Sequence, residues 1–496
     1  MIKKVSKLFS KENSIRGASI ILIITLALSN VLGLLRDRFL THNIDTYYLD
    51  IYYASFRIPD LIFNFLILGA ITSAFIPVLS DYIARGKDGE GYRVTNILIN
   101  LALIFTILAA IILFFLMPTI IPLIFEFDPF REAATIKYSR FLMLTPILFS
   151  VSYILGGVLN CYKRFVAYSI APILYNLSII AGAYFLAPKY GIKGVAVMVV
   201  LGAFLHMLIQ LISAWKLGFH YQWMIDLKNK SVRHIFRLMI PRTISMGANQ
   251  ILLIVYTAIA SALTVGSITA FTLANNIQTV PTVVLGTSFA TAIFPTLAIK
   301  IAQGKMEDFS LYLNKALRAI GFLLIPSSIL FFMFRAHIVR LLYGSGKFDW
   351  NDTTMTALTL GAFSISILAQ GLIPLVSKAF YALKNTRTPM YISLATVALS
   401  ILLAWPLRNL QINIGGEQVE LSVAGLALAF SIGSFFNAIV LILALRKHYK
   451  GVLDRALAFS YIKITIISVI MGLVIWRANH ILENFVDMNR IFKFLE

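Results

Sequence analysis

Apolar runs of about 20 residues recur along the whole chain, separated by short polar segments. A helix of that length crosses a hydrocarbon core of about 30 Å. The pattern therefore predicts an all-α multi-pass membrane protein with thirteen spans. The predicted spans are residues 17–35, 48–83, 94–117, 138–159, 166–187, 194–214, 238–263, 269–299, 319–334, 354–381, 390–407, 422–445 and 462–476.

Three of these spans, the second, eighth and tenth, are longer than a membrane requires and contain proline. Pro59 and Pro77 lie in the second, Pro281 and Pro295 in the eighth, and Pro374 in the tenth. Proline lacks a backbone N–H and its ring collides with the preceding helical turn. These three spans are therefore predicted to be bent or broken.

The composition agrees with a membrane protein, since 59% of the residues are hydrophobic and only 13% are charged. Soluble domains carry about 25% charged residues. Of the 43 Lys and Arg residues, 25 fall in the alternate loops that share a side with the N-terminus, and 14 fall on the opposite side. This bias predicts a cytoplasmic N-terminus. It also accounts for the net charge of +21 without nucleic acid as a partner.

The chain contains an internal repeat. Residues 73–86 (SAFIPVLSDYIARG) match residues 291–304 (TAIFPTLAIKIAQG) at an offset of 218, and residues 159–163 echo residues 380–384 at an offset of 221. An even number of spans separates the copies, so the halves share one orientation, as in transporters that rock two lobes. The predicted division is an N-lobe of six spans (1–214), a cytoplasmic linker (215–237), a C-lobe of six spans (238–445) and a C-terminal segment (446–496).

The C-terminal segment is predicted to hold the thirteenth span followed by an interfacial amphipathic helix. After Ala478, apolar residues recur at helical spacing with charged residues between them. This stretch is too charged to span a membrane. The apolar stripe is Ile481, Phe485, Met488, Phe492 and Leu495.

The sequence contains no pattern typical of an enzyme. It has no Walker A motif, no H-E-x-x-H and no nucleophile elbow, and its single cysteine, Cys161, excludes a thiolate metal site. We expect no cofactor and no metal site. Without an ATPase domain, transport would draw on the membrane potential, a monovalent ion or the substrate gradient.

Polar side chains inside the spans are the best indication of function. A charge at membrane depth costs about 2.5–3.5 kcal/mol by insertion scales, so it usually faces a cavity or a partner. The helical spacing of Asp50, Arg57 and Asp60 predicts that they share one face of span two. The alternative is that these groups pair with one another or mark an interface. The candidate substrate-binding residues, on spans 1, 2, 7 and 8, are Arg36, Asp37, Asp50, Arg57, Asp60, Arg242, Asn275 and Asn276.

Seven motifs occur in order over about 450 residues: VLGLLRD (31–37), FRIPDL (56–61), GAITSAFIPVLSDY (69–82), LNCYKRF (159–165), APILYN (171–176), YGSGKFD (343–349) and YALKNTRTP (381–389). Together they resemble the MurJ/MviN family of lipid II flippases. The chain departs from the family pattern at several cavity positions: Asn30 and Asn276 stand where arginine is usual, Phe63 and Asn64 replace an arginine pair, and Leu68 replaces glutamate.

The resemblance implies the MOP exporter fold, with two six-helix lobes in a parallel pseudo-two-fold repeat plus one extra span. It implies outward flipping of a polyprenyl-diphosphate-linked peptidoglycan precursor in a bacterial plasma membrane, by a monomer, with wall-synthesis proteins as candidate partners. Arg36 and Asp37 match the family's cavity pair. Two alternatives stay open: an exporter of another lipid-linked glycan or of a drug by ion antiport, and a non-transporting membrane scaffold.

Overall fold

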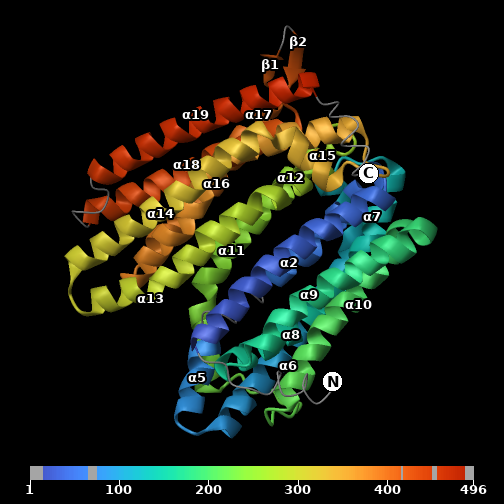
Figure 1. Cartoon of the computed structure of the whole chain (residues 1–496). Helices are drawn as coiled ribbons and strands as arrows, with labels where there is room; N and C mark the ends of the chain where they lie inside the picture. The colour runs from blue at the N-terminus through green and yellow to red at the C-terminus, as the bar shows by residue number, and fades with distance from the viewer. Residues whose placement is uncertain (1–14, 65–74, 415–416, 449–454, 486–496) are drawn as a thin grey trace. The chain divides into compact units, whose positions relative to one another are not determined.

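The structure, a computed structural model, describes residues 15–64, 75–414, 417–448 and 455–485 (Figure 1). Within these ranges each predicted span falls on a helix or a series of helices, and several helices extend well beyond the predicted ends. The helix of span one runs over Ile15–Asn43 and that of span three over Asp88–Ile124. Within the described ranges, nine helical stretches are long and apolar enough to cross a membrane. The predicted class, an all-α multi-pass membrane protein, is confirmed.

The first compact unit comprises residues 1–262. In it, α9 packs against both α2 and α10, and α10 packs against α8. Helix α11, which the repeat assigns to the second lobe, groups with this unit. Its elements are α2 (Ile15–Asn43), α3 (Thr46–Ser55), α4 (Arg57–Phe63), α5 (Ile76–Ala84), α6 (Asp88–Ile124), α7 (Pro129–Leu142), α8 (Leu144–Cys161), α9 (Phe165–Ala181), η3 (Gly182–Leu186), α10 (Ala187–Trp215) and α11 (Lys230–Ser261).

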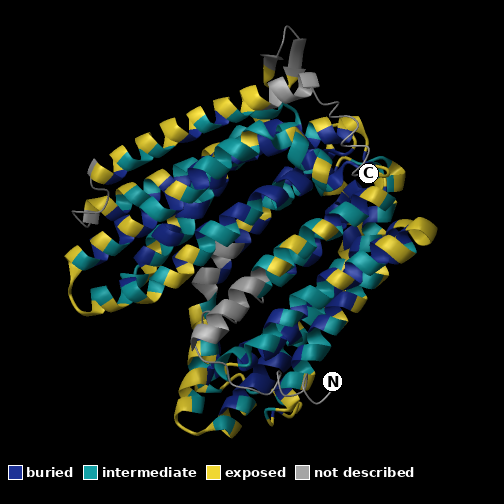
Figure 2. Ribbon diagram, in the orientation of Figure 1, coloured by how far each residue is buried: buried dark blue, intermediate teal, exposed yellow. Residues whose placement is uncertain are grey.

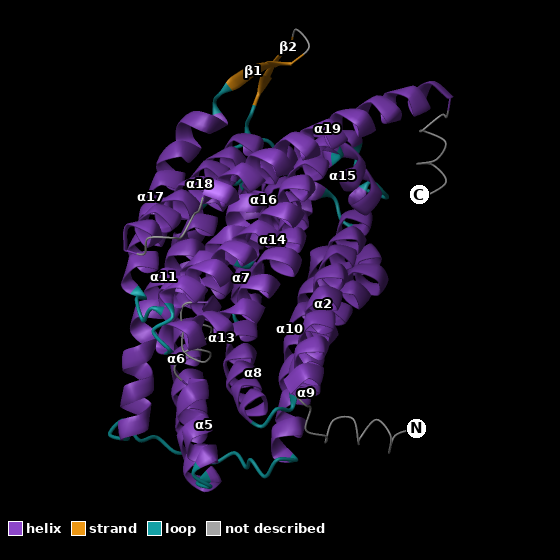
Figure 3. Cartoon of the chain, turned by 60° about the vertical axis from the view of Figure 1, so that its left-hand side comes forward, coloured by secondary structure: helices purple, strands orange, loops and turns teal. Residues whose placement is uncertain are grey.

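The second compact unit comprises residues 263–496. Helix α16 lies at its centre and packs against α12, α14 and α18, while α19 covers α14. A β-hairpin that the hydrophobic pattern does not predict joins α17 to α18 and projects beyond their ends (Figure 3). The elements are α12 (Ser267–Pro281), η4 (Thr282–Thr287), α13 (Ser288–Ala302), α14 (Met306–Met333), α15 (Arg335–Tyr343), α16 (Trp350–Ala382), α17 (Arg387–Arg408), β1 (Gln411–Ile414), β2 (Glu417–Glu420), α18 (Val423–His448) and α19 (Arg455–Phe485).

The prolines interrupt two of the three spans in which breaks are predicted. Helix α3 ends at Ser55 and α4 restarts at Arg57, two residues before Pro59, and Pro281 leads into the π-helical turn η4. Helix α16, in contrast, continues through Pro374. Helix α19 continues past the predicted end of its span, and the last part of the predicted amphipathic helix lies outside the described residues.

The burial pattern is that of a membrane protein, with apolar side chains on the outside as well as the inside. Figure 2 marks the buried and the exposed residues along each helix. On α6, Phe115 is 72% exposed, and on α19, Ile467 is 65% exposed. Polar residues such as Asn100 and Asp37 are instead fully buried. A lipid solvent permits this arrangement because it leaves large apolar side chains exposed without penalty.

The internal repeat is confirmed at the backbone. The helices that end the first repeated segment, α5 and α13, both stop before a left-handed glycine, Gly86 (φ 68°) and Gly304 (φ 71°). In the second segment α8 and α16 both stop before a left-handed lysine, Lys163 (φ 56°) and Lys384 (φ 58°). The N–H of the following residue then bonds to a carbonyl five residues back in all four cases, as in a Schellman motif.

Because lysine has a Cβ, the left-handed conformation is strained at Lys163 and Lys384 and relaxed at the two glycines. We expect Lys163→Gly and Lys384→Gly each to raise the unfolding free energy by about 0.5–1 kcal/mol, and Gly86→Ala and Gly304→Ala to lower it by about 1 kcal/mol. Thermal unfolding of the purified variants in one detergent measures this. Equal melting temperatures for all four variants would contradict the prediction.

The connection between α10 and α11, within the predicted linker, is bound to α6 by a ladder of buried polar side chains. Asn100 donates to the carbonyls of Gln222 and Met224 at 3.0 Å each and accepts from the Tyr221 hydroxyl at 2.7 Å. Asn96, one turn earlier, accepts from the Gln222 N–H at 3.1 Å. The linker is therefore an ordered strap along α6 rather than a free tether.

We expect Asn100→Ala to release this strap, because three hydrogen bonds disappear and two linker carbonyls lose their partner. The local stability should fall by about 1–3 kcal/mol, and the linker should become sensitive to limited proteolysis. Gln222→Ala is the matched control, since Gln222 binds α6 through its main chain. Equal proteolysis of the two variants would show that the side-chain ladder does not hold the linker.

Candidate functional site

The Arg36–Asp37 pair near the end of α2 forms the best-defined part of the polar cluster. Asp37 is fully buried, and its Oδ1 accepts from both Nε (3.0 Å) and Nη2 (2.8 Å) of Arg36. The Nη1 of Arg36 donates to the side-chain oxygen of Asn176 at 3.3 Å. A guanidinium has five N–H donors, so among the described residues two of them have no acceptor. With its side chain 22% exposed, Arg36 is fixed in orientation and still accessible.

Asn176, which the sequence analysis did not single out, connects α9 to α2. Its amide nitrogen lies 3.4 Å from the Ser29 hydroxyl oxygen and 3.2 Å from the Pro172 carbonyl oxygen. The carbonyl of Pro172 lies one turn earlier on the same helix, so this bond fixes the amide rotamer. The amide oxygen is thereby directed at Arg36. The sequence signals for this role are an asparagine inside an apolar span and its place at the end of the APILYN motif (171–176).

The second span supplies a second guanidinium. Arg57 is 9% exposed, and its Nε donates to the Thr257 hydroxyl of α11 at 2.7 Å. That hydroxyl in turn donates to the carbonyl of Leu253, so it is both donor and acceptor. Asp60, one turn after Arg57 on α4, lies within electrostatic range of Arg57 and of Arg36. Charged groups of the first two spans therefore influence one another within the first unit.

Asp50 belongs to a different helix from the other charges of its span. It lies on α3 and is 2% exposed, whereas Arg57 and Asp60 lie on α4, beyond the break at Phe56. The spacing argument for one shared face therefore applies to Arg57 and Asp60 alone. Counting formal charges, the predicted residues of this unit supply three carboxylates (Asp37, Asp50 and Asp60) and three guanidiniums (Arg36, Arg57 and, on α11, Arg242).

Helix α11 contributes neutral groups. The amide of Gln250, which is 6% exposed, accepts from Asn64 of span two at 3.4 Å. Asn249, its neighbour, is exposed. Arg242 lies on α11, but its side chain is outside the part of the chain that the structure describes. The contact between spans two and seven therefore involves Gln250 and Thr257.

In the second unit, the predicted asparagines lie on α12. Asn275 accepts from Gln278 at 3.0 Å, and Gln278 accepts from Gln370 of α16 at 2.9 Å. Gln370 also donates to Ser366 at 2.8 Å. Asn276 is half-buried. Asn275, Gln278 and Gln370 therefore form a hydrogen-bonded chain of side-chain amides in this unit. This chain of amides can bind polar groups but carries no formal charge.

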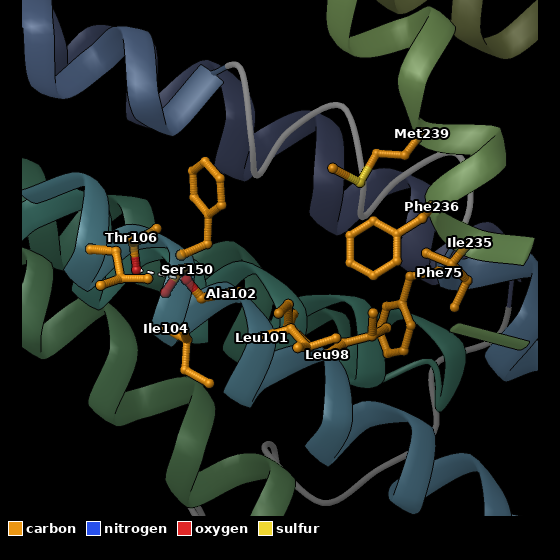
Figure 4. Close-up of a pocket in the computed structure, with 13 residues that line it drawn as sticks. Phe75, Leu98, Leu101, Ala102, Ile104, Thr106, Ser150, Ile235, Phe236 and Met239 are labelled. Atoms are coloured by element: carbon orange, nitrogen blue, oxygen red, sulfur yellow. Dashed lines mark hydrogen bonds between the residues drawn. The ribbon is translucent and has the colours of Figure 1, made fainter. Parts of the chain in front are cut away.

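An apolar cavity of about 410 Å³ lies between α5, α6, α8 and α11 (Figure 4). Its polar lining residues, Thr106 and Ser150, donate their hydroxyls to carbonyls of their own helices, Ala102 and Ile147. Phe75, Phe236 and Met239 are among the other lining residues. The cavity therefore offers hydrocarbon contacts and does not suit a charged headgroup.

The connection at the end of α6 positions the start of α3. Asp128 accepts from the backbone N–H groups of Phe130 and Arg131 and from the Arg131 side chain, and the Tyr47 hydroxyl donates to it at 3.2 Å. Burial raises the pKa of Asp128, but the hydrogen bonds from Arg131 outweigh it, so the pKa lies below its usual value.

A depressed pKa means that the contribution of Asp128 to stability is present above its unfolded pKa, about 3.9, and is lost as the pH falls through the folded value. We expect Asp128→Asn to lower the melting temperature at pH 7 and to have little effect at the acid end of the folded range. Melting curves of both proteins across pH measure this. A constant difference between them would contradict the prediction.

Comparisons with known proteins agree with this architecture. The family described as "Lipid II flippase MurJ" matches residues 45–495. A lipid II flippase MurJ of Burkholderia cenocepacia is 28% identical over 437 residues, which cover 85% of this chain and 81% of the relative.

Two solved structures establish the fold. A lipid II flippase MurJ in an inward closed conformation superposes with a TM-score of 0.78 at 24% identity, covering 92% of this chain and 93% of that one. An inward-facing multidrug resistance MATE transporter of the MOP superfamily superposes with a TM-score of 0.71 at 13% identity, covering 88% and 98%. The fold is thus the MOP exporter fold, and the matching family consists of flippases rather than enzymes. The chain belongs to the lipid II flippase MurJ family.

Proposed function

We propose that this chain flips a polyprenyl-diphosphate-linked peptidoglycan precursor, lipid II, from the inner to the outer leaflet of a bacterial plasma membrane. The observation that carries the proposal is the fixed guanidinium of Arg36, with N–H groups left for a ligand. A planar, permanently charged fork suits phosphate oxygens, which accept two parallel N–H bonds.

The other predicted residues take supporting roles. Asp37 orients Arg36, and Arg57 adds positive charge that offsets the carboxylates of Asp50 and Asp60. Arg242 would add a further cation, and the amides of Asn275 and Asn276 would bind sugar or peptide groups of the headgroup.

The energy source follows from the same topology. With the N-terminus in the cytoplasm, rocking of the two lobes would expose the site alternately to each side. An anionic headgroup that moves outward is driven by an inside-negative potential, at about 2.3 kcal/mol per charge per 100 mV. The chain would act as a monomer without a cofactor.

A second candidate is favoured by the charge balance of the first unit. The predicted residues of that unit balance three carboxylates against three guanidiniums, so they carry no net positive charge. Such a set would also suit a cationic cargo exchanged for an ion, as in a drug exporter. The other alternative, a non-transporting scaffold, is less well supported, because that role requires neither an accessible Arg36 nor the fold of a transporter family.

The test is complementation of a bacterial strain depleted of its own lipid II flippase. We expect growth, together with labelling of lipid II at the outer surface, when this chain is expressed. Membrane levels of the protein are measured by immunoblot in the same cells. Normal levels without growth or outer-surface lipid II would refute the proposal, and drug resistance in those cells would favour the second candidate.

A further inference from the structure

A second cavity, a groove of about 930 Å³, lies on the first unit between α6, α7, α8 and α10. Three basic side chains line it, Lys137 and Arg140 from α7 and Lys193 from α10. Its lining contains no acidic residue. Within the described ranges, none of the ion pairs involves these three cations.

Arg140 is held in place by a backbone carbonyl of α6 that has no hydrogen-bond partner within the helix. Pro118 has no N–H, so the carbonyl of Phe114, four residues earlier, lacks its helical partner. The Nε of Arg140 donates to this carbonyl at 2.8 Å, and its guanidinium lies 4.5 Å from the Phe114 ring centroid. This bond uses one donor and leaves the terminal nitrogens of Arg140 for a further acceptor.

The walls of the groove continue from these cations along the apolar face of α6. Ile107, Ile111 and Phe115 recur every four residues and are 41%, 51% and 72% exposed. Eight residues of helix extend over about 12 Å. On α10, Val197 is 46% exposed and lies one turn from Lys193. The groove is therefore cationic at one end and hydrocarbon-like along its length.

The position of the cations fits a membrane boundary. Lys137, Arg140 and Lys193 lie within three residues of the ends of predicted spans four and six, and Phe114 lies near the end of span three. At a membrane boundary, a lipid phosphate would lie against the three basic side chains, and the first part of its acyl chain would lie against the apolar face of α6.

We propose that this groove binds one anionic phospholipid, with its phosphate on the three basic side chains and an acyl chain along Ile107, Ile111 and Phe115. The site shares no residue with the polar cluster around Arg36, so it is separate from the proposed substrate site. A lipid held there would connect α6, α7 and α10, which carry the walls.

The test is native mass spectrometry of the purified full-length protein with phosphatidylglycerol and phosphatidylcholine of identical acyl chains. We expect one phosphatidylglycerol to bind at about tenfold lower concentration than phosphatidylcholine. The triple variant Lys137→Gln, Arg140→Gln, Lys193→Gln should lose this preference. The control with the same net charge, Lys216→Gln, Lys228→Gln, Lys230→Gln, alters exposed lysines outside the groove and should keep it.

A second variant addresses the acyl chain and keeps all the charges. Val197→Trp should fill the groove and weaken the binding of both lipids at least severalfold, and its melting temperature in lipid-free detergent reports whether it folds. Persistence of the preference in the triple variant, or its equal loss in the control, would overturn the proposal. So would unchanged binding to a folded Val197→Trp variant, or competition by millimolar glycerol phosphate, which would indicate a site for small anions.

Discussion

Arg36→Lys is expected to reduce lipid II flipping at least tenfold while leaving folding and membrane insertion intact. Lysine keeps the positive charge but replaces a planar fork by one ammonium group. That group cannot at once satisfy Asp37 and Asn176, which Arg36 contacts at 2.8–3.3 Å, and still bind a phosphate with two parallel bonds. Losing one charge-assisted hydrogen bond of about 1.5–3 kcal/mol corresponds to a factor of about 10–160.

The measurement is outer-leaflet appearance of lipid II in the depleted strain, normalised to the amount of protein in the membrane. Arg85→Lys is the matched control, because Arg85 forms an exposed ion pair with Asp81 on the helix-end turn after α5. Wild-type flipping by Arg36→Lys would show that the fork is not used for substrate.

The sequence predicted the class, and it placed the described spans on helices, because lipid imposes a single simple rule on length and hydrophobicity. It predicted the repeat because the same helix ends recur, down to the left-handed residues at Gly86 and Gly304. The break between α7 and α8, at Met143, was not predicted. Pro146 lies three residues after this break, just as Pro59 lies three residues after the break at Phe56, so the proline could have indicated it. The β-hairpin was missed because it is short and follows a long apolar span.

The candidate site was predictable only in part. Arg36, Asp37, Arg57 and Asp60 are conspicuous since charge is costly at membrane depth. Asn176 and Thr257, which bind the two arginines, are neutral residues 140 and 200 positions away. Nothing in the local pattern connects them, because the contacts depend on how separate helices pack. That the candidate residues on spans 1, 2, 7 and 8 bind one substrate together stays a prediction.

Close packing of two glycines in the second unit leads to the largest expected effect on stability. A Cβ added to Gly286 would lie 2.6 Å from the Cα and 3.0 Å from the carbonyl oxygen of Gly371. Both obstructing atoms are backbone, so rotation of a side chain cannot relieve the contact. The glycines thus let η4 approach α16 closely, as small residues do between membrane helices. Gln370, which binds Gln278 of α12, directly precedes Gly371.

Gly286→Leu is therefore expected to destabilise the protein by about 3 kcal/mol or more, the upper end of the range for overpacked cores, and to separate Gln278 from Gln370. Gly33→Leu is the matched control: Gly33 is also helical, and a Cβ there meets nothing within 4 Å. Since leucine favours helix over glycine by up to about 1 kcal/mol, this control should melt at the same temperature as the wild type or slightly higher. Denaturation in one detergent, followed by circular dichroism, compares the two variants. A Gly286→Leu protein as stable as Gly33→Leu would mean that η4 and α16 can move apart without cost, and the amide chain of the second unit would then have no rigid support.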